Sequence, residues 1–589
     1  MRDRLLVRHF LWRFLEHDFI SANADRREAL SVVGGAVISI SLFFSALIAI
    51  EYQFSNFMPP GIASQQSVDD RFMFVTSSMF VMALLAVALW DALALDARDT
   101  AVLGILPLPR AVIVRSKYCA VALVAVAADL AWNLAPTLFR SASVPITLPI
   151  GFRGGLVLTL AQGTVTVAAG AFGFLSVVAL REGLTAVLGQ RHFRVVAAPL
   201  QAALVVVLTS VLLLLPATSR HVSRNWLARE GVASRILPPL WFVGLHEMLA
   251  GSVIDSLPRT RPDPYLVAQE REATTLYRSL WPRYHELGRT AVTALAVATL
   301  LSVIACAWNS RRLPSLMIHR RHNAAPGRLL SKWIVANLVA RSPLQQAGFW
   351  FTWQSLSRRV THRTTLASAI AVGLSLVAIA VRERGLAVQK DLASAPLALF
   401  AAQSLLLVSI LTGFRHAAQL PAELRASGTF SLAWRGDPAP FLSGVKRAGW
   451  VALALPTLSL LFFWHAAMLG VRVAGWHAAT GAAFSVLIIE LLFLRYRRLP
   501  LVSGYAPIAD LKSRGPMYVV AVLLGCYSLA WIEQTTLTTS SSAPIMLVVG
   551  IVAIAGGVAA YDRAWRSSAV ILVDDDDSPL PTQRLNLAG

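Results

Sequence analysis

Three polar side chains, Asp129, Asn133 and Glu490, lie inside long apolar segments of the sequence. An ionisable group inside a bilayer is costly, so such residues often mark a substrate or proton site, or a hydrogen bond between helices. Asp129 and Asn133 are four residues apart and therefore share one face of a helix. Both functions stay open for this pair. Glu490 is close to one end of its segment, where it could also reach interfacial water.

The motifs of common catalytic and cofactor sites are missing from the sequence. No GxxxxGK[ST] pattern occurs, so the chain has no Walker loop to bind nucleotide phosphates and is not expected to hydrolyse ATP alone. His246 and Glu247 begin an HExxH pattern, but Ala250 stands where the second zinc ligand belongs. No GxSxG motif is present. We therefore expect a protein that is not an enzyme, with no catalytic, cofactor or metal site. The three cysteines lack metal-site spacing: Cys119, Cys306 and Cys526.

The elements that position these residues must be membrane helices. Apolar types make up 56% of the 589 residues, charged types only 14%, and the mean hydropathy is +0.60. The formal net charge of +21 could suggest nucleic acid. However, the Lys and Arg residues flank apolar segments instead of forming basic blocks interleaved with aromatic residues, so we expect no nucleic-acid partner. The partner that the composition indicates is the lipid bilayer.

Twelve apolar segments are long enough, or nearly so, to cross a bilayer, which requires about 20 helical residues. The segments at 366–381 and 517–531 are short, so they either extend further or do not fully span. The predicted fold is an all-α, polytopic integral membrane protein with about 12 transmembrane helices. The predicted spans are 30–50, 72–92, 118–138, 156–180, 195–215, 290–308, 366–381, 396–414, 449–468, 477–494, 517–531 and 543–561.

The distribution of basic residues predicts the orientation of the chain. Most of the 53 Lys and Arg residues fall in alternate segments that share a side with the N-terminus. The positive-inside rule places this side in the cytoplasm. Many of the remaining basic residues lie in the long segment 217–289, which the rule discounts. We therefore expect a multi-pass protein of the inner (plasma) membrane with both termini in the cytoplasm.

The order of predicted elements repeats once along the chain. Residues 5–19 and 342–360 are amphipathic, too charged to span and too apolar to remain in water, so each is predicted to lie along the cytoplasmic membrane surface. Six predicted spans follow each surface helix, which gives two pseudo-repeated six-helix halves. The predicted parts are 1–308, the first half; 309–341, a basic cytoplasmic linker; 342–561, the second half; and 562–589, an acidic cytoplasmic tail.

Two long cytoplasmic loops, 96–117 and 419–449, follow the second span of each half. Each begins with acidic residues, contains a proline-marked turn and an amphipathic stretch, and ends with basic residues at the next span. Such a loop could present an apolar ridge to a protein partner, although its charges could equally be membrane anchors or solvated groups. The candidate contact residues are Asp96, Arg110, Arg115, Lys117, Glu423, Lys446 and Arg447.

This order of elements resembles the type-2 ABC transporter permeases, in which a surface helix precedes six spans. In that family a coupling helix between spans two and three docks on a separate ATPase subunit. The stretch DARDTAVLGILPLPRAVIVRSK, residues 96–117, is similar to that loop. The resemblance implies an exporter permease with two fused halves. Its implied partners are two copies of an ATPase subunit and, as an option, accessory subunits. It also implies re-entrant structure in 217–289, where 236–251 is apolar but too short to span.

The alternative class is an ion-coupled secondary transporter with Asp129 as the coupling site. Twelve spans with both termini in the cytoplasm also describe the major facilitator fold. That fold carries a GxxxDRxGRR pattern between spans two and three, whereas residues 96–117 contain one glycine, Gly104, and no closing Arg pair. A membrane scaffold or a membrane-bound synthase is a third class.

Overall fold

The structure is a computed structural model of the chain. Its description covers most of the predicted spans, together with isolated positions between them. The described ranges are 2–15, 60–90, 109–147, 151–219, 235–255, 278–312, 335–382, 395–420, 439–496, 511–540 and 542–568, with 38–39, 41–42, 45–46, 93, 272, 275–276, 392 and 499–501.

Within these ranges the chain is helical and contains no strand, which confirms the all-α prediction. Eleven helices are long and apolar enough to cross a membrane, so the protein is a multi-pass membrane protein. They correspond to eleven of the twelve predicted spans. The remaining one, 30–50, falls almost wholly outside the described residues.

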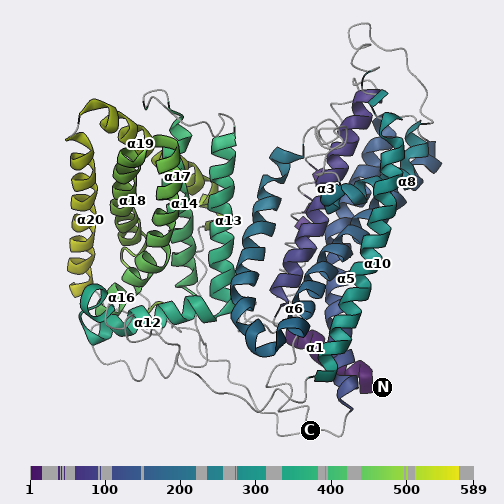
Figure 1. Ribbon diagram of the computed structural model, residues 1–589, viewed down its shortest axis with the longest axis horizontal. Helices are drawn as coiled ribbons and strands as arrows, with labels where there is room; N and C mark the ends of the chain where they lie inside the picture. Colours follow the sequence, from purple (N-terminus) through teal and green to yellow (C-terminus); the bar gives the residue numbers. More distant parts are fainter. Residues whose placement is uncertain are drawn as a thin grey trace. The chain divides into compact units, whose positions relative to one another are not determined.

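The chain divides into two compact units, unit 1 (Met1–Arg320) and unit 2 (Arg321–Gly589), each of which is described by itself. In unit 1, helices α3, α5 and α10 lie beside α6 (Figure 1). The helices of unit 1 are α1 (Arg2–Leu15), α3 (Pro60–Ala88), α5 (Arg110–Thr147), α6 (Gly151–Thr218), α8 (Pro238–Asp255) and α10 (Trp281–Arg312).

In unit 2, helix α12, which lies within the segment 342–360 predicted as a surface helix, crosses the ends of the upright helices in Figure 1. Segments α16, η6 and α17 follow one another without a break, and η6 is a π-helical turn. The helices are η4 (Val335–Val339), α12 (Pro343–Arg358), α13 (Val360–Arg382), α14 (Leu397–Ala417), α16 (Ala439–Gly449), η6 (Trp450–Ala454), α17 (Leu455–Leu469), α18 (Val471–Leu492), α19 (Leu511–Thr539) and α20 (Ala543–Ser568).

Helix α6 contains both predicted spans 156–180 and 195–215, and the helical conformation is interrupted between them at one residue, Gly189. Gly189 adopts φ 70° and ψ 158°, a conformation that side chains with a Cβ rarely accept. An added Cβ at this position would meet open space, so backbone conformation alone accounts for the glycine. The helical run therefore breaks at Gly189, and the two spans are distinct.

The segment expected to be re-entrant, 236–251, forms most of helix α8. Leu240, Phe242 and Val243 are fully buried against α3, α6 and α10. Two polar residues also fix the helix, because Glu247 of α8 forms an ion pair with Arg71 of α3 inside unit 1. Helix α8 is thus an integral part of the packed core of unit 1.

In each unit the helix predicted to lie on the membrane surface packs on the helix that follows the long loop predicted to be cytoplasmic. In unit 1, Leu6 and Phe10 of α1 pack against Ile113 and Ala120 of α5. In unit 2, Phe349 of α12 is packed in one cluster with Ala448 of α16. The same pairing of elements therefore occurs twice.

The sequence explains the sharp start of α12. Ser342 accepts a hydrogen bond from the backbone N–H of Gln345, and the Gln345 side chain accepts one from the backbone N–H of Ser342. This capping box satisfies N–H groups that have no partner within the helix. Pro343 occupies the first turn, where its lack of an N–H costs nothing.

Candidate functional site

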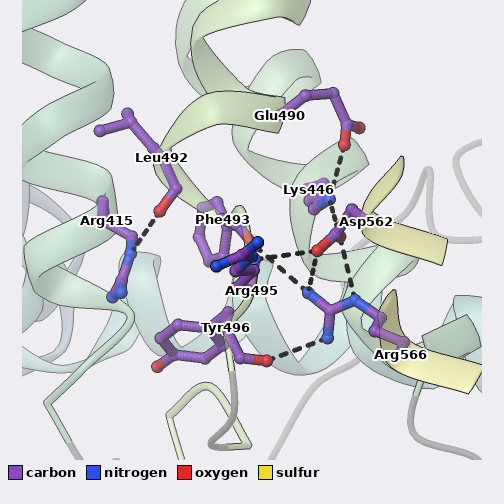
Figure 2. A network of polar contacts seen from close by, with 9 residues as sticks. All are labelled: Arg415, Lys446, Glu490, Leu492, Phe493, Arg495, Tyr496, Asp562 and Arg566. Atoms are coloured by element: carbon purple, nitrogen blue, oxygen red, sulfur yellow. Dashed lines mark hydrogen bonds and ion pairs between the residues drawn. The ribbon is translucent and has the colours of Figure 1, made fainter. Parts of the chain in front are cut away.

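A polar cluster in unit 2 joins the ends of four helices and includes two of the predicted site residues. Lys446 of α16 places its Nζ 2.7 Å from Oε2 of Glu490 on α18 and 3.4 Å from Oδ2 of Asp562 on α20 (Figure 2). Two carboxylates thus converge on one ammonium group. We call the set Arg415, Lys446, Glu490, Arg495, Asp562 and Arg566 the polar junction.

Helix α20 is fixed to the end of α18 by the second part of the polar junction. Asp562 accepts hydrogen bonds from Nε of Arg566 (2.9 Å) and from the backbone N–H of Arg495 (2.9 Å). Arg566 also donates to the carbonyl oxygens of Tyr496 (3.0 Å) and Phe493 (3.2 Å). These bonds satisfy the carbonyl groups that a helix end leaves without partners. Figure 2 shows Arg566 lying between α20 and the residues that follow α18, Phe493 to Tyr496.

Helix α14 is connected through Arg415 to the turn that follows α18, residues 493–496. Its Nε donates to the carbonyl oxygen of Leu492 (2.8 Å), and its guanidinium lies 4.2 Å from the ring centroid of Tyr496. A guanidinium over an aromatic ring gains electrostatic attraction in addition to dispersion. The polar junction consequently links α14, α16, α18 and α20 at the end that the charge pattern places in the cytoplasm.

The structure separates the predicted loop residues into different environments. Lys446 and Glu490, predicted for separate roles, form an ion pair. Arg447 is exposed and donates to the carbonyl oxygen of Val339, and Arg115 is exposed on α5. Lys117 is buried, with its Nζ 5.7 Å from the ring centroid of Phe10. Arg110 is the first residue of α5, its side chain lies outside the described part, and Asp96 and Glu423 lie outside the described residues.

Asp129 and Asn133 of α5 meet α3 and α6 in the interior of unit 1. Nδ2 of Asn133 donates to Oδ1 of Asp129 and to Oγ of Ser78, both at 2.8 Å. Ser78 of α3 in turn donates to the carbonyl oxygen of Thr166 on α6, also at 2.8 Å. This geometry is that of a hydrogen-bonded helix junction, one of the two functions expected for the pair.

Glycine allows the helices to approach at this point and at a matching point in unit 2. A Cβ added at Gly170 of α6 would lie 2.1 Å from Oδ1 of Asp129. A Cβ added at Gly481 of α18 would lie 2.2 Å from Nε2 of Gln403 on α14. Gly170 and Gly481 each lie on the fourth predicted span of their half. In each unit this glycine therefore lets the span approach a polar side chain of a neighbouring span.

We predict that Asp129→Asn changes the free energy of unfolding by less than about 1 kcal/mol, because the amide oxygen can still accept from Asn133. Asp129→Leu removes the acceptor and should cost about 1–3 kcal/mol, since it leaves buried polar groups unpaired. Unfolding by sodium dodecyl sulfate in mixed micelles, followed by circular dichroism, measures both. Equal losses for the two variants would show that the carboxylate charge itself is required.

Unit 1 has its own polar contacts where α6 approaches α10. Nδ2 of Asn309 donates to Oε2 of Glu182 (2.6 Å) and to the Glu182 carbonyl oxygen (2.9 Å). Arg181 forms an ion pair with Glu182. In each unit, a glutamate near the end of the fourth predicted span of its half, Glu182 just after 156–180 and Glu490 within 477–494, therefore contacts a polar group of a neighbouring helix.

Sequence reasoning missed several buried ionisable residues. The ion pairs Arg71–Glu247 and His477–Glu533 each join two helices, whereas Asp562 and Arg566 pair within α20, and no sequence motif marks any of these pairs. The usable signal is the one applied to Asp129: an ionisable residue within a helix-length apolar segment. These residues are Arg71 and Glu247 in unit 1, the latter considered only as part of an incomplete HExxH pattern, and His465, His477, Glu533, Asp562 and Arg566 in unit 2.

The site and fold define a multi-pass membrane protein with charged helix junctions. The chain matches no protein-family model, no curated protein and no solved structure. In the part of the chain that the structure describes, no group of His, Cys, Asp or Glu side chains could hold a metal ion.

Proposed function

We propose that the chain is the membrane-spanning permease subunit of an ABC exporter. A separate ATPase subunit, in two copies, would dock on the cytoplasmic loops 96–117 and 419–449. One observation carries this proposal: in both units a surface helix is packed on the start of the helix that leaves the corresponding loop. A force applied to either loop would thus reach a helix that is held at the membrane surface.

In unit 2 the packing between the surface helix and the post-loop helix is very close. A Cβ added at Gly444 of α16 would lie 2.1 Å from the carbonyl oxygen of Gln345 on α12. A Cβ added at Gly348 of α12 would lie 2.2 Å from the carbonyl oxygen of Phe441 on α16. Because backbone touches backbone, α12 and α16 must shift together.

The polar junction extends this path from the loop to the transmembrane helices. Lys446 lies on α16 and contacts carboxylates on α18 and α20. Displacement of α16 would therefore pull on both helices, because opposite charges at 2.7 Å resist separation in a partly buried site. ATP-driven closure of the partner would use this connection to shift unit 2 between two access states.

Co-purification tests the proposal directly. The full chain, solubilised from its native membrane, should carry a P-loop ATPase that mass spectrometry identifies and whose activity is present in the eluate. Asp96→Arg combined with Glu423→Arg should reduce the recovered ATPase at least about tenfold, a loss of about 1.4 kcal/mol in binding. Both residues stand in the acidic starts of the predicted docking loops.

Asp263→Arg is the matched control, since it reverses one charge in the long segment predicted on the opposite side of the membrane. It should leave the recovery of the ATPase unchanged. Purification of the wild-type chain without any ATPase would contradict the proposal. Ion-coupled transport through Asp129 would then be the function to test.

A further inference from the structure

Three ionisable side chains meet inside unit 2, away from the polar junction. His465 of α17, His477 of α18 and Glu533 of α19 are 0%, 1% and 3% exposed. Nδ1 of His477 lies 2.7 Å from Oε1 of Glu533. The two imidazole ring centroids are 4.4 Å apart, with an interplanar angle of 71°. We call these three residues the histidine cluster.

Both ring nitrogens of His465 face carbonyl oxygens. Nδ1 lies 2.9 Å from the oxygen of Leu461, and Nε2 lies 3.2 Å from the oxygen of Leu399. A neutral imidazole has one N–H and one lone pair, so it can donate to only one of these acceptors. The other nitrogen would then direct its lone pair at an oxygen. The imidazolium form donates to both, so the surroundings of His465 match the charged ring.

The histidine cluster also contains a balancing charge. Burial opposes an isolated positive charge on His465. Oε1 of Glu533 lies 2.7 Å from Nδ1 of His477, whose ring packs against that of His465, so the carboxylate supplies a negative charge to this pair of rings. Nε2 of His477 is buried and forms no hydrogen bond, so one nitrogen of this ring is still available for a proton.

The neighbouring helices add polar groups but few ionisable ones. Nε2 of Gln403 on α14 donates to the carbonyl oxygen of His477 (2.7 Å) and so fixes the backbone beside the cluster. Residues 543–560 of α20 contain no ionisable side chain. The other ionisable side chains on the facing parts of α13, α18 and α19 are Arg382, Arg472, Cys526 and Tyr527.

The position of the cluster gives it a short route to water. His465 is four residues before the end of α17, His477 six residues after the start of α18, and Glu533 six residues before the end of α19. At 1.5 Å per helical residue, these residues lie about 6–9 Å from the helix ends. The charge pattern of the sequence places this end opposite the cytoplasm.

We propose that the histidine cluster is a binding site for one exchangeable proton, taken from water at this membrane face. The proton forms an N–H bond on the imidazole of His465, a hydronium ion becomes water, and no electrons are transferred. With the proton bound, the imidazolium and the Glu533 carboxylate cancel, and without it the cluster carries one negative charge. The site is independent of ATPase docking.

Nitrogen NMR of the full chain in lipid nanodiscs, with ¹⁵N-labelled histidine, tests this proposal. The signals of His465 are identified by their loss in His465→Gln. In the wild type at about pH 6, both nitrogens of His465 should be protonated, and at about pH 9 one should have lost its proton. Glu533→Gln should leave His465 neutral at pH 6, because the balancing charge is gone while the side chain can still accept from His477.

His192, which is exposed in unit 1, serves as the internal control, and its signals should be the same in the wild type and in Glu533→Gln. A neutral His465 in the wild type at every pH between about 5 and 9 would overturn the proposal. An imidazolium that persists unchanged in Glu533→Gln would overturn it as well. If Glu533→Gln does not fold, the wild-type pH series decides alone.

Discussion

Replacement of Lys446 by methionine is expected to reduce the free energy of unfolding by about 2–4 kcal/mol, because it leaves the carboxylate of Glu490 without its partner. The full cost of an unpaired buried charge is about 3–5 kcal/mol, and the partial exposure of Glu490, 18% of its side chain, reduces it. Asp562 keeps Arg566, so it contributes less to the loss. Unfolding by sodium dodecyl sulfate in mixed micelles, followed by circular dichroism, measures the change.

Arg447→Met is the control, since it removes a charge from the next residue of the same helix. Arg447 is exposed, and its loss should cost less than about 1 kcal/mol. Adding Glu490→Gln to Lys446→Met should restore about 1–2 kcal/mol, because it neutralises the unpaired carboxylate. Equal costs for Lys446→Met and Arg447→Met would show that the ion pair contributes no stability.

The hydropathy pattern predicted where helices form but not where they end. The span predicted at 517–531 continues to Thr539 in α19, because the polar residues that follow it find partners. Glu533 pairs with His477, and Gln534 donates to the carbonyl oxygens of Leu392 and Ala395. Likewise α20 continues past residue 561, since Asp562 and Arg566 form an ion pair one turn apart.

The candidate site was only partly predictable for the same reason. Glu490 was recognisable as an ionisable residue in an apolar segment. The sequence pattern places Lys446 in a loop, because the charges and prolines of 419–449 hide the start of α16 at Ala439. Its partners lie 44 and 116 residues further along the chain. Hydropathy and local motifs do not predict ion pairs between residues so far apart in the sequence.

The histidine cluster illustrates the remaining limit. His465 and His477 are separated by Gly470, whose φ of 85° ends α17 and allows α18 to fold back beside it. Only that reversal places the two rings 4.4 Å apart. Glu533 comes from a third helix, so its approach depends on the packing of α14 and α18 against α19. Chemistry built from three helices is visible only after they are packed.

Gly444→Leu is expected to separate α12 from α16 and to cost about 3 kcal/mol or more, the upper end of the range for overpacked sites. The added Cβ would lie 2.1 Å from the carbonyl oxygen of Gln345 and 2.9 Å from the backbone nitrogen of Phe349. Backbone atoms of a packed helix cannot rotate aside as a flexible side chain would. The same unfolding assay measures the loss, and Trp353 of α12 offers a site for a local fluorescence change.

Gly475→Leu is the matched control. Gly475 lies on α18, is exposed, and has nothing within 4 Å of its added Cβ, so leucine there should be neutral or should stabilise the helix by up to about 1 kcal/mol. Equal behaviour of the two variants would refute the close packing of α12 on α16.

If Gly444→Leu alone also uncouples ATP hydrolysis from transport while the ATPase remains bound, the contact transmits force. Binding is then set by the loops, and coupling by the pair of helices behind them.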